Sequence, residues 1–113
     1  MDRALALVEQ FRPYAVHRNG VDYFCRRTAL EIVDRCGEMN LHVYGIDGYF
    51  LTDQITHQPI EWILDMSKCP SDYDAARKFI ESGAVLPLFY EFVLGDSLQE
   101  GSNTRSSRKR RLW

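Results

Sequence analysis

The feature that most constrains the fold is a helical repeat of apolar side chains that begins at Val21. Apolar or small residues recur at intervals of three and four, the spacing of one face of an α-helix. They are Val21, Phe24, Cys25, Thr28, Ala29, Ile32, Val33 and Cys36. Charged residues fall between them, and Asn19 or Gly20 offers an N-terminal cap. The pattern predicts an amphipathic helix over residues 21–36.

Two further segments carry helix signals at both ends. Asp2 can cap a helix over residues 3–11, whose apolar side chains share one stripe. Ser71 resembles the start of a capping pair before a helix over residues 72–82, which Gly83 ends. We therefore expect three helices, each with one apolar face to bury.

The strands are expected in the second half of the chain. Runs of β-forming residues on either side of Asp47-Gly48 predict a hairpin over residues 41–52, with its turn at that dipeptide. Residues 88–94 are apolar on nearly both sides, which is typical of a central strand. Residues 60–66 fit a short helix, but residues 62–64 within them could equally form a strand.

Together these elements indicate an α+β fold. The chain has 113 residues, which is enough for one domain with its own core and too few for two. We expect residues 1–100 to form a single domain with a small, single-layer, mostly antiparallel sheet packed by the three helices. Residues 101–113 lack an apolar stripe and are expected to be a flexible basic tail.

Charge is divided unevenly between the two parts. Residues 1–100 contain nine Lys and Arg against sixteen Asp and Glu, a net charge of −7 that arises within residues 41–100. The basic residues of the tail are Arg105, Arg108, Lys109, Arg110 and Arg111. Such an acidic domain attracts basic partners. The tail has four interpretations: a solvated segment, a contact for nucleic-acid phosphates, a segment that folds back on the acidic half, or an extension left by cloning.

The sequence contains none of the common catalytic or nucleotide-binding motifs. We therefore expect a non-enzymatic protein without cofactors. The three histidines are scattered, so no metal site is expected. Glu91 lies in the apolar strand, and we expect it either to be partly exposed or to pair with an arginine of the long helix. An unfamiliar enzymatic site around His42, Asp47 and Glu91 is the least favoured hypothesis.

Aromatic and acidic residues gather between positions 44 and 65. Tyrosine and tryptophan are frequent anchors of protein interfaces, and an acidic rim steers a basic partner toward them. The candidate partner-binding residues are Tyr44, Asp47, Tyr49, Asp53, Glu61, Trp62 and Asp65. The alternative is core packing, which we expect for the neighbouring Phe50 and for at least one of the tyrosines.

In size, acidity and lack of catalytic motifs the chain is similar in general character to bacterial immunity proteins, which neutralise basic toxin domains. That likeness implies a protein-binding module that covers a basic toxin or nuclease. The alternative is a nucleic-acid-binding or regulatory protein that uses the basic tail. We expect a cytoplasmic location, because there is no apolar run long enough for a membrane span or signal peptide, and the three cysteines do not suggest a disulfide framework.

Overall fold

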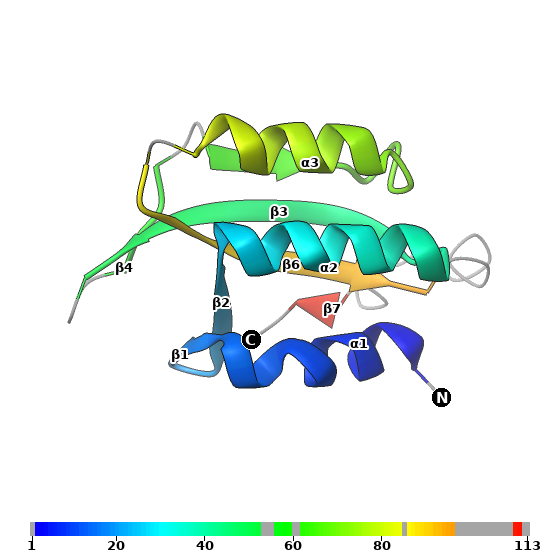
Figure 1. The fold of residues 1–113 in the computed structure, drawn as a ribbon, viewed down its shortest axis with the longest axis horizontal. Helices are drawn as coiled ribbons and strands as arrows, with labels where there is room; N and C mark the ends of the chain where they lie inside the picture. Colours follow the sequence, from blue (N-terminus) through cyan, green and yellow to red (C-terminus); the bar gives the residue numbers. More distant parts are fainter. Residues whose placement is uncertain (1, 53–55, 60–61, 85, 97–109, 112–113) are drawn as a thin grey trace.

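The protein is described by a computed structural model that covers residues 2–52, 56–59, 62–84, 86–96 and 110–111. Three helices lie across one side of an antiparallel sheet (Figure 1). The fold is α+β, as the sequence predicted.

The helices are α1 (Arg3–Phe11), α2 (Arg26–Met39) and α3 (Tyr73–Ser82), and the 3-10 turn η1 (Arg12–Tyr14) follows α1. The strands are β1 (Val16–Arg18), β2 (Val21–Cys25), β3 (His42–Leu51), β4 (Thr56–His57), β5 (Ile63–Asp65), β6 (Leu88–Gly95) and β7 (Arg110–Arg111). The strand order is β1-β2-β6-β3-β4, while β5 also pairs with β3 and β7 with β6.

The first and third helices begin and end close to the predicted residues. The Asp2 carboxylate accepts a 3.1 Å hydrogen bond from the Leu5 amide and so caps α1. Asp72, rather than Ser71, caps α3 by accepting from the Ala75 amide, and Gly83 ends that helix. Both caps satisfy amides that would otherwise lack a partner in the first helical turn.

The long helix is shorter at its N-terminal end than the apolar spacing predicted. Residues 21–25 form β2, and α2 occupies residues 26–39. The reason is the Asn19-Gly20 dipeptide, in which both residues have positive φ, 51° and 79°. Two such residues form the tight turn that joins antiparallel strands, so Asn19-Gly20 closes the β1–β2 hairpin instead of capping a helix.

The predicted hairpin over residues 41–52 is wrong, because β3 runs without a turn from His42 to Leu51. Asp47 and Gly48 lie within the strand, opposite Glu91 and Tyr90 of β6. Gly48 allows a close approach: a Cβ there would lie 3.1 Å from the Cβ of Trp62. Pairing with β6 over eight positions outweighs the local turn preference of the dipeptide.

The central strand is β6, as predicted, with β2 on one edge and β3 on the other. The side chains that pack in the core beneath the helices are those of Leu88, Tyr90, Phe92 and Leu94. The alternate side chains, on the opposite side of the sheet, are those of Phe89, Glu91 and Val93. The segment for which the sequence left both a helix and a strand open contains β5, a strand at residues 63–65.

The core lies between the helices and the sheet. Each helix contributes fully buried residues to it, including Leu7 of α1, Ile32 of α2 and Ile80 of α3. Among the described residues, no helix has both the length and the apolar character that crossing a membrane requires.

Candidate functional site

A groove of about 310 Å³ lies beside β5 and brings together three of the predicted binding residues. Tyr44 and Asp47 come from β3, and Asp65 comes from β5. Asp47 is paired in register with Ile63 and alternates with the core residue Ile46, so this part of the groove faces away from the helices. We call this site the β3–β5 groove.

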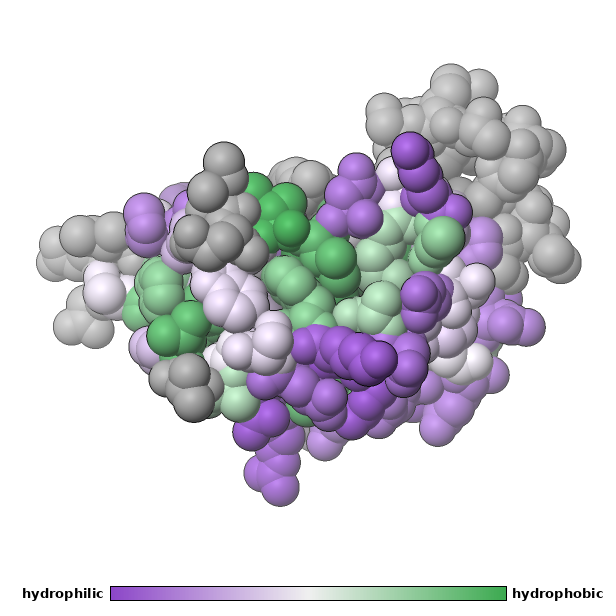
Figure 2. Space-filling view, turned by 90° about the horizontal axis from the view of Figure 1, so that it is seen from above, coloured by the Kyte–Doolittle hydropathy of each residue, from purple (hydrophilic) through white to green (hydrophobic). Residues whose placement is uncertain are grey.

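Apolar side chains form part of the groove wall. Ile63 is 47% exposed, and Leu64 and Val93 also line the groove. Figure 2, which looks down on α3 and β5, shows hydrophobic residues in the middle of the view, with hydrophilic residues above, below and to the right of them. An exposed apolar residue within a polar border is typical of a protein-binding surface.

Hydrogen bonds hold the polar residues of the groove in place. The Asp65 Oδ1 atom accepts from the Ser67 amide at 2.9 Å and from its hydroxyl at 2.7 Å. The Tyr44 hydroxyl lies 3.1 Å from His42 Nδ1, and the two rings meet edge to face. These contacts lower the conformational entropy that Asp65 and Tyr44 would lose on binding a partner.

Tyr49 lies on the same strand but has a different surrounding. Its hydroxyl donates a 2.9 Å hydrogen bond to Glu91 Oε1, and its ring packs edge-on against Tyr23 at 5.0 Å. Burial, together with the nearby Glu91 carboxyl, raises the pKa of Tyr49 well above its ordinary value. Tyr49 therefore serves as a hydrogen-bond donor to a buried carboxyl, and it is not among the residues that line the groove.

Trp62 does not line the groove either. Its ring packs against Phe79 of α3, with 5.6 Å between the ring centroids, and it contacts the core from the side of the helices. The remaining predicted binding residues, Asp53 and Glu61, lie outside the described residues.

Glu91 is more deeply buried than expected. It is 2% exposed, so the expected partial exposure is wrong, and its described hydrogen-bond partner is Tyr49. Within β3, His42 contacts Tyr44, while Asp47 lies opposite Glu91. No described contact joins His42 to the two carboxyl groups of the hypothetical enzymatic site.

The structure describes only the backbone of Arg110 and Arg111 in the basic tail. These residues form β7, which pairs with Val93 and Leu94 of β6. Arg105, Arg108 and Lys109 lie outside the described residues.

Two features of the structure were not predicted from the sequence. Ile63 is the exposed apolar residue of the groove, and its signal was the short β-forming run after Trp62. Asp22 is a buried carboxylate that accepts from Arg12 Nε at 3.1 Å and also contacts His17 Nδ1. The signal for that cluster was the Asn-Gly turn, which places His17 directly opposite Asp22.

The cysteines are free thiols in different surroundings. Cys25, expected to be buried within a helix, is instead exposed at the N-cap of α2. Burial favours a higher pKa for this thiol, but the Thr28 hydroxyl and the first amides of α2 outweigh it, and the pKa is lowered. Burial raises the pKa of Cys36 to about 12. Among the described residues, no group of His, Cys, Asp and Glu side chains is arranged to hold a metal ion.

Comparisons with models of protein families, with curated proteins and with solved structures found no match to this chain.

Proposed function

We propose that this chain is a non-enzymatic protein-binding module that holds a basic protein in the β3–β5 groove, in the manner of an immunity-type inhibitor that covers a basic toxin or nuclease. The observation that carries the proposal is the groove itself. An exposed Ile63 lies in it beside the carboxylates of Asp47 and Asp65. Such a surface offers both an apolar contact and an attraction for positive charge.

The charge of the domain supports a basic partner. Residues 41–100 contain ten acidic side chains against three basic ones. A field of one sign over a binding surface raises the rate at which an oppositely charged protein associates. A nuclease is a suitable partner class, because its active site is positively charged to hold phosphate. A cytoplasmic location belongs to the same proposal and is supported by the three free thiols.

Site-specific photo-cross-linking in cells tests where the partner binds. We would place a photoreactive amino acid at Ile63 and, in a matched control, at Leu5, an exposed apolar residue of α1. We expect a partner with a strongly basic surface to cross-link at position 63 and not at position 5. Capture at position 5 alone, or capture of an acidic partner, would contradict the proposal.

The purified partner then allows a kinetic test with matched charge changes. Asp65→Asn removes one negative charge in the groove and keeps the Oδ1 atom that accepts from Ser67. Asp74→Asn makes the same change in net charge on α3, where the carboxylate is 81% exposed. We expect Asp65→Asn to slow association several-fold at low salt and to weaken its salt dependence, because rim charges act mainly on association. Equal effects of the two substitutions would leave only the net charge of the domain as an explanation.

The alternative function, nucleic-acid binding through the tail, makes a different prediction. Each phosphate contact by a tail arginine or lysine adds to the salt dependence of nucleic-acid affinity. A fluorescence titration of the full chain with single- and double-stranded DNA and RNA tests it. Binding that persists when all five basic tail residues are replaced by Gln would not come from the tail.

A further inference from the structure

Within residues 2–96, as far as the structure describes them, β2 covers only part of one edge of β6. β3 pairs with β6 from Leu88 to Gly95 along the opposite edge. On the edge that faces β2, the described pairs join β2 to Phe89 and Tyr90. A strand edge without a neighbour presents backbone amides and carbonyls that can pair with another extended segment.

Two residues of the basic tail, Arg110 and Arg111, lie on this edge. Arg111 lies opposite Val93, and Arg110 lies opposite Leu94, in antiparallel register. Because β3 pairs with the same two β6 residues on the other side, β7 must take the edge that β2 leaves (Figure 1). The fourteen residues between Gly95 and Arg110 give ample length for this return.

Charge explains why a basic segment suits this edge. Backbone pairing alone is indifferent to side-chain type, so selectivity depends on the surroundings. Asp96 follows β6 directly, and Asp47 and Glu91 form the pair two positions before Val93 on the same side of the sheet. The tail carries five positive charges and no negative one, and the domain carries a net charge of −7.

The edge and the β3–β5 groove meet at Val93. This residue lines the groove and is paired with Gly45 on one side and with Arg111 on the other. A partner segment that replaced β7 on this edge of β6 would therefore lie next to the surface that the groove provides.

We propose that the edge of β6 at Val93–Gly95 is a strand-addition site for an extended basic peptide, and that the chain's own C-terminal segment occupies it as an intramolecular competitor. The inference rests on the proposed function for the basic character of the partner. In the absence of a partner, the edge of β6 is occupied by the Arg110–Arg111 segment of the same molecule. Displacement of that segment frees the edge for the partner.

Hydrogen exchange in the full-length chain tests the occupancy. Arg110→Pro/Arg111→Pro removes both backbone donors, while the control Arg110→Lys/Arg111→Lys keeps donors and charge. We expect the β6 amides that point toward β7 to exchange at least tenfold faster in the proline variant and at the wild-type rate in the control. Unchanged exchange of the Ile32 and Val33 amides in α2 shows that the fold is intact. Equal β6 exchange in all three chains would overturn the proposal.

A peptide added in trans tests the binding chemistry of the edge. The probe is the fluorescently labelled peptide of residues 105–113, and its control carries proline at both positions that correspond to Arg110 and Arg111. We expect the probe to bind the proline variant at least tenfold more tightly than the wild-type chain, because the wild-type edge is occupied. Absence of binding, or equal affinity for both chains, would overturn the proposal.

Two further readouts separate the alternatives. A concentration-dependent dimer that disappears in the proline variant would show that the tail pairs with a second copy, which overturns intramolecular competition. Asp65→Asn tests the proposed function independently. If the peptide does not bind but Asp65→Asn slows association of the partner, only the strand-addition site is contradicted. If the peptide binds as expected but Asp65→Asn has no effect, only the groove is contradicted as the partner's site.

Discussion

Glu91 is a single buried residue that helps to hold three strands together on the side of the sheet opposite the helices. Burying a carboxyl group costs free energy unless hydrogen bonds replace its contacts with water. The Tyr49 hydroxyl supplies one of these hydrogen bonds, and the Tyr23 ring packs against Tyr49. Contacts of three side chains thus connect β2, β3 and β6 on the side of the sheet that the helices do not cover.

Removing the hydroxyl of Tyr49 is expected to destabilise the protein. Tyr49→Phe leaves the buried carboxyl of Glu91 with one donor fewer, which should lower the free energy of unfolding by about 1–3 kcal/mol. Tyr14→Phe removes a hydroxyl from a residue that is 69% exposed and should change it by less than about 0.5 kcal/mol. Urea titrations of both variants measure the difference. Equal values would mean that the Tyr49–Glu91 hydrogen bond adds nothing to stability.

The thiols are expected to differ in reactivity. At pH 7–8 the lowered pKa of the exposed Cys25 gives more thiolate, whereas Cys36 is buried and stays protonated. Iodoacetamide should therefore alkylate Cys25 much faster than Cys36, which mass spectrometry of a time course can follow. Thr28→Val removes the neighbouring hydroxyl and should slow the reaction of Cys25 several-fold, while Thr28→Ser should preserve it. A faster reaction at Cys36 would contradict both assignments.

At the scale of elements, local signals predicted the helices better than the strands. The helices near 3–11 and 72–82 followed from spacing and from end residues that act on their own backbone, such as Asp2. Apolar spacing over residues 21–25 suits a strand as well as a helix when read over only five positions. Asp47-Gly48 has the composition of a turn, but its conformation depends on β6, which lies more than forty residues away in the chain.

The core face of α2 gives a direct test of the helix that the apolar spacing identified. Ile32 is 1% exposed, and Ile32→Ala should lower the free energy of unfolding by about 2–5 kcal/mol, because it leaves a cavity. Arg35, on the outer face, makes a surface ion pair with Glu38. Arg35→Ala should therefore cost less than about 1 kcal/mol. Denaturant titrations that give equal losses would contradict the assignment of the two faces.

For the molecule as a whole, the sequence identified part of the candidate site. Tyr44, Asp47 and Asp65 are close in sequence and line one groove. Trp62 and Tyr49 do not line the groove. Trp62 packs against Phe79 of α3, and Tyr49 donates a hydrogen bond to Glu91 of β6, so the position of each side chain depends on a tertiary contact. A register irregularity between Val43 and Gly45 changes which β3 side chains face the core. No local sequence pattern predicts this irregularity.

Buried tyrosines give the whole molecule a predicted pH dependence. Burial raises the pKa of Tyr23, Tyr49, Tyr73 and Tyr90 above the ordinary value of 10.0. Below pH 10 these groups are protonated in both states, so their contribution to stability is fully present. Above pH 10 the unfolded chain ionises first, and the free energy of unfolding should fall. Urea titrations from pH 8 to 11 measure the decline, and Tyr49→Phe should make it shallower.

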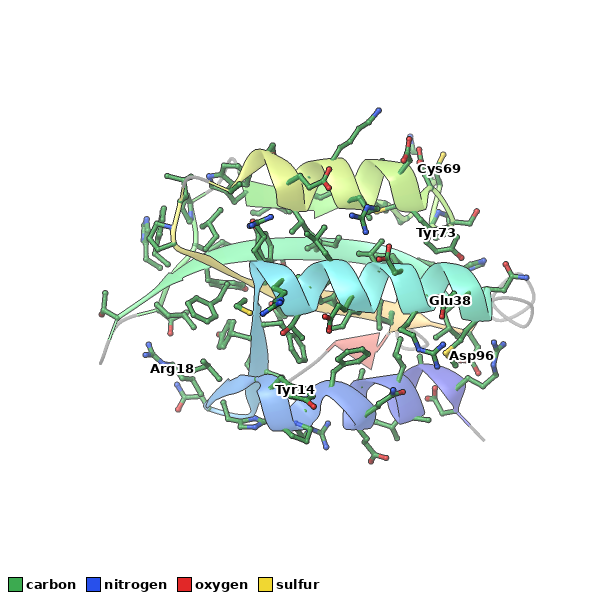
Figure 3. All side chains as sticks on the ribbon, viewed as in Figure 1. Tyr14, Arg18, Glu38, Cys69, Tyr73 and Asp96 are labelled. Atoms are coloured by element: carbon green, nitrogen blue, oxygen red, sulfur yellow. The ribbon has the colours of Figure 1, made fainter. Side chains whose placement is uncertain are left out.

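Asp96 joins the two ends of the domain. Its carboxylate accepts hydrogen bonds from the Ala4 and Arg3 amides at 2.9 and 3.4 Å, so the residue that follows β6 caps the start of α1 (Figure 3). During synthesis on the ribosome, α1 is made before Asp96, so its first amides lack this hydrogen-bond acceptor until β6 has also been made. β2 and β3 also lack their shared neighbour until then, because β6 is the strand that lies between them. The nascent chain therefore cannot assemble β2, β6 and β3 into one sheet until β6 has left the exit tunnel, and until then the apolar faces of α1 and α2 are open to chaperones.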